Sequence, residues 1–179
     1  MIRLWHMLVQ NTVFISYRRT NIYIARALYQ ELKKHNYDCF LDYNSIDNGS
    51  FERIILGQIR ARGHFILVLT PTTLERCTSP EDWVRREIEC ALEHQRNIVP
   101  IMFDDFDFAK HGFPYLEDKL DTLPKYNALR IHADYFEEGV TRLVERFLSK
   151  PIDTTLHPII ESVTDSAVPN VSLDRLREA

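Results

Sequence analysis

The residues whose types and spacing best suit chemistry are a tryptophan and a glutamate four positions apart, Trp83 and Glu87. If the segment 82–88 (Asp-Trp-Val-Arg-Arg-Glu-Ile) is helical, this spacing puts the indole and the carboxylate on one helix face. The apolar positions of that helix form a stripe, and Glu87 falls at its edge at about 100° per residue. A carboxylate at the rim of a core is partly desolvated, which makes it more reactive. The alternative is a solvated glutamate on an ordinary amphipathic helix.

The length and charge of the chain restrict the kinds of protein it can be. Its 179 residues correspond to one domain, or to one domain with a tail. The net charge of -4, from 22 Lys and Arg and 26 Asp and Glu, argues against a nucleic-acid-binding surface. No apolar run is long enough to span a membrane, and the apolar residues 1–10 lack the cleavage site of a signal peptide. We therefore expect a cytoplasmic protein with no membrane partner.

The cysteine, histidine and glycine patterns predict no resident cofactor and no metal. Cys39, Cys77 and Cys90 are scattered and form no Cys-x-x-Cys pair, which fits a reducing compartment. The seven histidines show no metal-ligand spacing, so a zinc site is not expected. The five glycines form neither Gly-x-Gly-x-x-Gly nor a Walker-type motif, so a dinucleotide held in a Rossmann turn is not expected.

Two kinds of element alternate along the chain and must position Trp83 and Glu87. Short apolar runs predict strands at residues 12–16, 39–41, 65–69, 98–102 and 128–132. Helical spacing of apolar residues predicts helices at residues 21–35, 51–63, 79–95 and 140–148. This alternation predicts an α/β domain with a mainly parallel sheet, and the right-handed crossover rule puts helices on both faces.

Local signals refine some of these elements. Ser79 has the properties of an N-cap, and Pro80 would then occupy the first helical position. Pro100 indicates that the fourth strand lies near a sheet edge or contains a bulge. The segment 42–50 is a polar loop rich in turn residues, and the segment 103–125 is irregular and acidic.

Composition changes near both ends of the chain. Residues 1–11 precede the first strand and are predicted to be an N-terminal extension of a domain that covers residues 12–150. Pro151, Pro158 and Pro169, with serines and threonines between them, predict a linker or tail over residues 151–179. The last residues of that tail have the pattern of a starting helix, so a further domain is a possible continuation.

Several of these segments together resemble the TIR (Toll/interleukin-1 receptor) domain family. In chain order, the similar segments are 13–19 for the first signature box, 40–42 for the second strand, 49–51 for the BB loop, 65–71, Cys77 and 82–88 for the third strand and third helix, and 97–101 for the fourth strand. The likeness covers roughly residues 12–148 in order. It implies a flavodoxin-like open parallel five-stranded sheet with helices on both faces.

Within this family the sequence is most similar to the enzymatic, NAD-cleaving branch, which includes an axonal enzyme and bacterial defence proteins. That branch shares Trp-x-x-x-Glu on the third helix, and Trp83 and Glu87 match it. The resemblance implies that Glu87 is the catalytic residue, that NAD+ is the substrate, and that the protein acts in immune or cell-death signalling. Ser50 departs from the pattern, since the axonal enzyme has a lysine there, and the BB loop lacks the proline of many receptor TIR domains.

A single carboxylate is sufficient for the chemistry that this resemblance implies. Cleavage of the nicotinamide–ribose bond passes through an oxocarbenium-like transition state, as glycoside hydrolysis does. Nicotinamide leaves from a positively charged pyridinium and departs neutral, so no general acid is required. Glu87 can stabilise the developing positive charge or hold the ribose hydroxyls. Whether the product is ADP-ribose, cyclic ADP-ribose or a variant cyclic form stays open.

Further residues are predicted to bind the substrate. Arg18 and Arg19 follow the first strand at its carboxyl end, where open α/β sheets bind ligands, and arginine suits bidentate phosphate contacts. For each of them the alternative is a charge that faces solvent. Trp83 would form a wall that excludes water, or would only pack the helix. The predicted substrate-binding set is Ser16, Tyr17, Arg18, Arg19, Ser50, Phe51 and Trp83, with Tyr17 more structural than catalytic.

The polar loop at residues 43–50 has two expected roles. It is the natural lid over the site, and in TIR domains it is also an assembly surface. Its assembly residues are predicted to be Tyr43, Ile46 and Gly49. The expected partner is therefore a second TIR domain, through self-association.

Three other kinds of protein are alternatives to an NAD-cleaving TIR domain. A response-regulator receiver would need an acidic cluster after the first strand, but residues 16–19 are basic. An enzyme like the nucleoside deoxyribosyltransferases would also use a lone glutamate, but the segments above fit a TIR domain better. The main rival is a non-catalytic TIR interaction module in which Glu87 is incidental.

Overall fold

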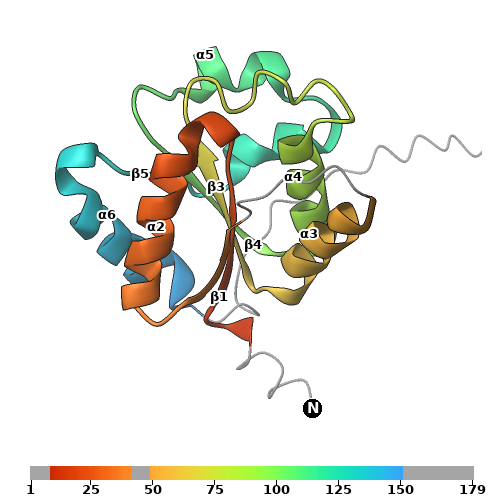
Figure 1. Ribbon diagram of the computed structural model, residues 1–179. Coiled ribbons are helices and arrows are strands. Elements are labelled where there is room, and N and C mark those ends of the chain that lie inside the picture. The colour runs from red at the N-terminus through yellow and green to blue at the C-terminus, as the bar shows by residue number, and fades with distance from the viewer. Residues whose placement is uncertain (1–8, 42–48, 151–179) are drawn as a thin grey trace, which may run out of the picture.

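The computed structural model describes residues 9–41 and 49–150, which form a five-stranded parallel sheet covered by helices on both faces (Figure 1). The strands are β1 (Thr12–Ser16), β2 (Asp38–Leu41), β3 (His64–Leu69), β4 (Asn97–Met102) and β5 (Leu129–Arg130). Their order in the sheet is β2-β1-β3-β4-β5, and every neighbouring pair is parallel. This is the flavodoxin-like order, so the predicted fold class is confirmed.

Helices of different lengths connect the strands. The α-helices are α2 (Ile22–Lys34), α3 (Gly49–Ala61), α4 (Trp83–Glu93), α5 (Phe108–His111) and α6 (Phe136–Leu143). Short 3-10 segments are η1 (Arg19–Asn21), η2 (Phe113–Tyr115), η3 (Asp118–Lys125) and η4 (Ala133–Tyr135), and a π-helical turn, η5 (Val144–Leu148), follows α6. Figure 1 shows α2 and α6 on one face of the sheet and α3 and α4 on the other. The segment between β4 and β5 is irregular with short helical pieces, as predicted.

Alternation along β1 explains why a polar residue of this strand faces α4. Val13 and Ile15 belong to the core beneath α2 and α6, whereas Phe14 belongs to the core beneath α3 and α4. Ser16 has the same parity as Phe14, and side chains two residues apart on a strand share a face. A hydroxyl therefore stands at the carboxyl end of β1, on the side that α4 covers.

The predicted start of α4 is wrong. The N-cap is Asp82, not Ser79, and its side chain accepts a hydrogen bond from the backbone N–H of Arg85 at 3.1 Å. Ser79 and Pro80 lie in an irregular turn, where the Ser79 carbonyl accepts from the Asp82 N–H at 3.1 Å. Both serine and aspartate are good caps, and Asp82 takes this role because Arg18, between β1 and η1, holds its carboxylate in place.

The predicted position of the fourth strand near a sheet edge is confirmed. β4 lies between β3 and β5, and Pro100 is in register with Leu67 of β3. On the other side, β5 is only two residues long and pairs with Ile101 and Met102. Pro100 therefore has a strand neighbour on one side only, which is why a residue without an N–H is tolerated in an internal strand.

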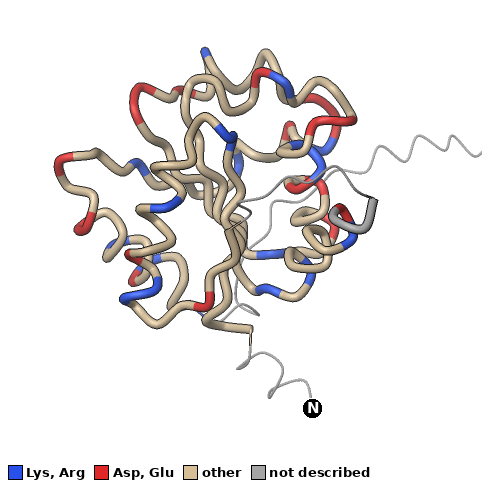
Figure 2. Tube along the Cα trace, viewed as in Figure 1, with Lys and Arg blue, Asp and Glu red and all other residues tan. Residues whose placement is uncertain are grey.

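Charge is distributed evenly over the described part of the chain. Figure 2 shows Lys and Arg interspersed with Asp and Glu along the trace, without a long segment of one sign. In residues 9–41 and 49–150, no helix has the length and apolar character needed to cross a membrane. The three cysteines are buried and free.

Candidate active site

The carboxyl end of β1 and the amino end of α4 meet at a cavity of about 230 Å³. In a flavodoxin-like sheet, this end of β1 is the topological switch point, where ligands bind. The residues that line the cavity come from β1, η1, α3, the β3–α4 loop and α4: Ile15, Tyr17, Arg18, Arg19, Ile55, Arg76, Glu81, Asp82, Trp83, Val84 and Glu87.

Glu87 lines this cavity and is more deeply buried than its sequence position predicts. The residue is 7% exposed, because the side of α4 that packs on the sheet is wider than the apolar stripe and includes Glu87. The hydroxyl of buried Ser16 donates a hydrogen bond to Glu87 Oε2 at 2.6 Å. The carboxylate is thus desolvated but anchored at the end of β1, and does not lie at a wet rim.

Trp83 forms the outer wall of the cavity. It is the first residue of α4, one helical turn before Glu87, and is 38% exposed. The guanidinium carbon of Arg86 lies 5.0 Å from the Trp83 ring centroid, within cation–π range, and Arg86 also pairs with Glu52 of α3. Arg86 has no role in the sequence prediction, although its i, i+3 spacing from Trp83 could have indicated this contact.

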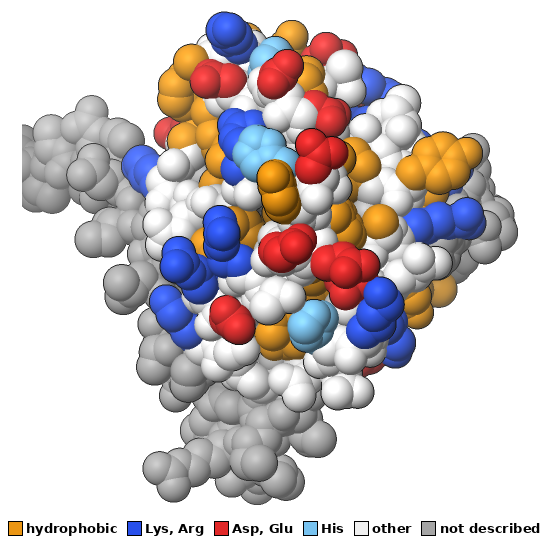
Figure 3. All heavy atoms as spheres, turned by 90° about the vertical axis from the view of Figure 1, so that its left-hand side faces the viewer, with side chains coloured by type: hydrophobic (Ala, Val, Ile, Leu, Met, Phe, Trp, Pro, Cys, Tyr) orange, Lys and Arg blue, Asp and Glu red, His pale blue; other side chains and the backbone are white. Residues whose placement is uncertain are grey.

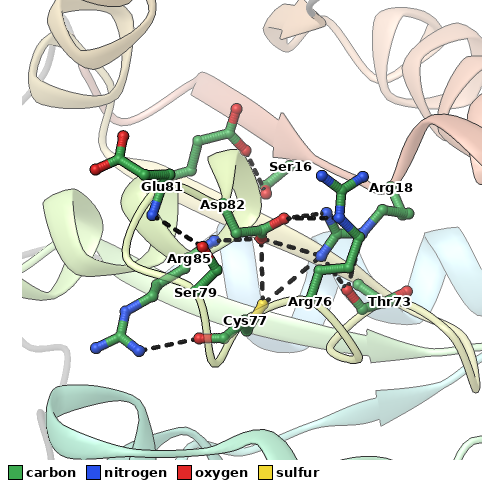
Figure 4. Close-up of polar contacts among 10 residues, drawn as sticks. Ser16, Arg18, Thr73, Arg76, Cys77, Ser79, Glu81, Asp82 and Arg85 are labelled. Carbon is green, nitrogen blue, oxygen red and sulfur yellow. Dashed lines mark hydrogen bonds and ion pairs between the residues drawn. The ribbon is translucent and has the colours of Figure 1, made fainter.

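Arg18 and Asp82, which both line the cavity, form a largely buried ion pair (Figure 4). Arg18 Nη1 lies 2.6 Å from Asp82 Oδ2, and Arg18 Nη2 lies 3.0 Å from Asp82 Oδ1. Arg18 Nε and Nη2 also donate to the Thr73 carbonyl, at 3.0 and 2.6 Å. Burial alone would raise the pKa of Asp82, but hydrogen bonding from Arg18 and the charge of Arg18 outweigh it and lower that pKa.

Cys77 lies next to this ion pair but is not a nucleophile. Its sulfur is 3.5 Å from Asp82 Oδ1 and 3.7 Å from Arg18 Nη2. Burial, followed by the charge of Asp82, raises the pKa of the Cys77 thiol to about 12. The thiol therefore stays protonated at neutral pH, and thiolate chemistry is not available to it.

The structure brings most of the predicted site residues to one place. Tyr17, Arg18, Arg19, Trp83 and Glu87 line the same cavity, and Ser16 joins them through its hydrogen bond to Glu87. Tyr17 is half-buried and also packs against the core beneath α2 and α6, in keeping with a mainly structural role.

Five other predicted residues are not placed by the structure. Gly49, Ser50 and Phe51 belong to the first turn of α3, and the structure does not describe their side chains. Tyr43 and Ile46 lie outside the described residues. The lid, the assembly surface and the contribution of Ser50 to substrate binding therefore stay predictions.

The sequence prediction missed the contribution of the loop between β3 and α4. Arg76 and Glu81 of this loop line the cavity. Both follow the carboxyl end of a buried parallel strand, which is the position where ligand-binding residues are expected in such sheets. The same rule that predicts Arg18 and Arg19 after β1 also predicts ligand-binding residues after β3.

A second, larger hollow of about 950 Å³ lies at the carboxyl ends of β4 and β5 and reaches α2 and α6. Figure 3 views this side of the molecule, where acidic, basic, histidine and hydrophobic side chains are mixed. Of its charged lining residues, Asp104, Asp105, Asp107 and Lys110 are exposed and Arg130 is half-buried, in contrast to buried Asp82 and Glu87. In the described ranges, no group of three His, Cys, Asp or Glu side chains could hold a metal ion in either hollow.

The fold and the first cavity define a class of protein: a flavodoxin-like α/β domain whose switch point carries a buried carboxylate and several arginines. Comparison with known families is consistent with this class and makes it specific. The family profile described as TIR domain matches residues 13–144. The chain belongs to the TIR domain family.

Curated relatives are enzymes by name. The chain is 37% identical over 154 residues to the NAD(+) hydrolase tir-1 of Caenorhabditis elegans, covering 82% of this chain and 15% of that protein. It is 36% identical over 140 residues to the NAD(+) hydrolase sarm1 of Drosophila melanogaster, covering 76% of this chain and 10% of that protein. The chain thus spans less than a fifth of the length of these relatives.

A solved structure has a similar fold. The metazoan TIR-STING receptor from C. gigas, in complex with 2',3'-cGAMP, superimposes with a TM-score of 0.55 at 19% identity. The similarity covers 78% of this chain and 39% of the receptor chain. At this identity, the likeness shows the fold and does not extend to the ligand.

Proposed function

We propose that this TIR domain cleaves the nicotinamide–ribose bond of NAD+ and that Glu87 is its catalytic residue. The observation that carries the proposal is the position of Glu87: buried, anchored by Ser16, and on the wall of a cavity next to Trp83. The relatives named NAD(+) hydrolase support the reaction type.

The proposed mechanism needs one carboxylate. As the bond from ribose C1' to the pyridinium nitrogen breaks, its electron pair goes to the nitrogen and nicotinamide leaves neutral. The positive charge that develops on the ribosyl group is stabilised by Glu87, whose desolvated position strengthens the attraction. Water then adds to C1' and releases a proton, which gives ADP-ribose. If an adenine nitrogen adds to C1' instead, the product is cyclic.

The cavity fits the reacting end of the substrate better than the whole dinucleotide. Its volume of about 230 Å³ is below the range of roughly 300–1,000 Å³ of pockets for drug-sized ligands. We place the nicotinamide and its ribose between Trp83 and Glu87, where the indole excludes water from the breaking bond. The diphosphate then lies at the mouth, where arginines surround it. NAD+ is the substrate, and the proposal requires no cofactor.

We further propose that the domain works as a self-associated assembly in cytoplasmic immune or cell-death signalling. The loop at residues 43–50 is polar and contains Ile46 and Gly49, so it offers little apolar cover to close a cavity within one chain. A neighbouring TIR domain would supply the missing cover. This part of the proposal rests on the family resemblance.

The direct test is to incubate the purified 179-residue chain with NAD+ and to quantify nicotinamide and the ribosyl product by chromatography. We expect equimolar nicotinamide and ADP-ribose or its cyclic form. No nicotinamide, from folded protein at high concentration and also after fusion to an oligomerising partner, would identify the chain as a non-catalytic TIR interaction module.

The assembly proposal predicts a dependence on concentration. Turnover per molecule should rise across a dilution series of roughly a hundredfold, because protomer association follows mass action. Replacing Ile46 or Gly49 by a bulky charged residue should abolish the rise without unfolding the sheet. Light scattering gives the assembly state at each point. Constant turnover from a protein that stays monomeric would show that one chain forms a complete site.

A further inference from the structure

The three arginines that line the cavity differ sharply in what they contact. The Arg18 side chain is 13% exposed, and its nitrogens donate to Asp82 and to the Thr73 carbonyl. Arg19 is exposed at the start of η1. The Arg76 side chain is 77% exposed, and its Nε lies 3.8 Å from Asp82 Oδ2, at the limit of an ion pair. The Arg18 guanidinium is therefore occupied by contacts within the protein, whereas Arg19 and Arg76 carry charges that face the solvent at the cavity mouth.

Two side-chain contacts connect the end of β1 and the residues after it to α4, and Arg18 makes one of them. Ser16 holds Glu87 in the second turn of α4, and Arg18, two residues further along the chain, holds Asp82 at the helix N-cap. Because α4 is a continuous helix over Trp83–Glu93, fixing it at positions 82 and 87 sets both its depth and its direction. The location of the Glu87 carboxylate therefore depends on the Arg18–Asp82 pair.

The β3–α4 loop is held by the same connection after β1. The Asn21 side-chain amide donates to the hydroxyls of Thr70 and Thr73, at 2.8 and 3.3 Å. The Thr70 N–H donates to the Thr73 hydroxyl at 2.9 Å. Arg18 adds its two hydrogen bonds to the Thr73 carbonyl. The loop that carries Arg76 is thus a fixed support, and the Arg76 side chain extends from it.

We propose that Arg18 is a positioning residue, which places Glu87 through Asp82, and that Arg19 and Arg76 receive the diphosphate of the substrate. The inference rests on the proposed function, since it assigns roles within the same site. If Arg18 turned toward a phosphate, the buried Asp82 carboxylate would lose its two short contacts and keep only the exposed Arg76 at 3.8 Å, which is costly. Arg76 can turn without that loss, because Arg18 already neutralises Asp82. Two exposed guanidiniums suit a diphosphate with two anionic groups.

Steady-state kinetics separate the two roles. Arg18→Ala should lower kcat roughly 10- to 100-fold with KM within about twofold, since a small misplacement of a catalytic group has effects of this size. Arg18→Lys, which keeps the charge but not the planar fork, should recover part of kcat. Arg19→Ala and Arg76→Ala should each raise KM about tenfold and retain kcat. Arg142→Ala, an exposed arginine on α6, is the matched control.

A double-mutant cycle tests whether Arg18 acts through Asp82. Asp82→Asn keeps a capping side chain but removes the charge, and should lower kcat as Arg18→Ala does. The double variant Arg18→Ala/Asp82→Asn should lose no more than the worse single variant, because both changes break one interaction. Additive losses, or an Arg18→Ala variant that changes only KM, would overturn the positioning role.

A binding experiment does not depend on turnover and keeps the two proposals distinguishable. ADP carries the diphosphate and cannot react, so its affinity can be measured by calorimetry. Arg19→Ala and Arg76→Ala should each weaken ADP binding about tenfold, whereas Arg18→Lys should leave it within about twofold. This result with an inactive wild type would refute only NAD+ cleavage. Wild-type protein that fails to bind ADP, or binding that depends on Arg18 and not on Arg76, would overturn the assignment.

Discussion

Two buried polar clusters lie at opposite ends of the sheet and have different surroundings. At the carboxyl end, Ser16 and Glu87 border a cavity with Arg18 and Asp82. At the amino end, His64 and Asn97 begin β3 and β4 and are buried. His64 Nε2 lies 2.7 Å from the Gln10 carbonyl oxygen, and its Nδ1 lies 2.8 Å from Asn97 Nδ2. Burial lowers the pKa of His64 to about 4.

The hydrogen-bond partners of the amino-end cluster define its role. A carbonyl oxygen only accepts, so Nε2 of His64 carries the proton and Nδ1 accepts from the Asn97 amide. The same amide donates to the Phe147 carbonyl at 2.9 Å. The cluster is neutral and joins the segment before β1, two strands and the π-helical turn η5. It stabilises the fold and offers no group to a ligand.

The comparison shows that burial and a perturbed pKa do not by themselves identify a functional site. Both clusters are buried, and His64 has one of the largest pKa shifts among the described residues. The difference is that the carboxyl-end cluster contains charges and borders a cavity at the switch point of the sheet. Changes at the carboxyl end should therefore alter the rate of the proposed NAD+ cleavage, and changes at the amino end should alter stability.

The largest expected effect is that of Glu87→Gln on the rate. Glutamine still accepts a hydrogen bond from Ser16 but has no charge, so kcat for nicotinamide release should fall roughly 10²- to 10³-fold. Urea unfolding should show little change in stability. Glu93→Gln, at the exposed end of the same helix and paired with Lys119, is the control and should keep the wild-type rate. A Glu87→Gln protein with near-normal turnover would refute the catalytic role of Glu87.

The next effect is a pH dependence of stability that comes from the amino-end cluster. An unfolded histidine has a pKa near 6.5, whereas that of folded His64 is about 4, so between these values only the unfolded chain binds the proton. The contribution of neutral His64 is complete above pH 6.5 and is lost as the pH falls toward 4. At about 1.36 kcal/mol per pKa unit, it amounts to roughly 3 kcal/mol. Urea unfolding of wild type and His64→Leu from pH 4 to 7.5 should give curves that converge at low pH, and parallel curves would contradict the assignment.

A smaller effect is expected for the same variant at neutral pH. His64→Leu removes the hydrogen bonds of His64 to the Asn97 amide and to the Gln10 carbonyl, which should lower the free energy of unfolding by about 1–3 kcal/mol. Turnover of NAD+ per folded molecule should not change, because the cluster lies at the opposite end of the strands from the cavity. A loss of turnover in fully folded His64→Leu protein would mean that the two ends of the sheet are coupled.

The smallest effect is expected for Ser16→Ala. Removing the hydroxyl leaves Glu87 in place on α4 but without its anchor on β1, so kcat should fall about tenfold, equivalent to about 1.4 kcal/mol. Ser16→Thr, which restores a hydroxyl, should recover most of this loss. Stopped assays of nicotinamide release on these two variants are sufficient. Equal rates for wild type and Ser16→Ala would show that α4 packing alone holds the carboxylate.

The sequence was sufficient for the fold and for the placement of Trp83 beside Glu87, because both depend on local patterns. Continuous apolar runs predicted the strands, and the i, i+4 spacing of Trp83 and Glu87 placed both on one helix face. Contacts between distant segments could not be predicted in this way. Arg18 and Asp82 are 64 positions apart in the sequence. Residue spacing therefore predicted neither their ion pair nor the N-cap at Asp82. Without these contacts, the sequence wrongly predicts Ser79 as the helix cap and assigns Arg18 and Arg19 the same role.

The central proposal is that NAD+ binds and is cleaved at the Glu87 cavity, and NMR mapping of substrate binding tests it most directly. The Glu87→Gln variant of the full chain is titrated with NAD+ while its backbone amide and indole N–H signals are followed. We expect the shifts to cluster at residues 16–19, at Arg76 and at residues 82–84, with the His64 and Asn97 amides unchanged. Shifts confined to the second hollow, around Tyr23 and Phe136, with residues 16–19 unchanged, would contradict the proposed site.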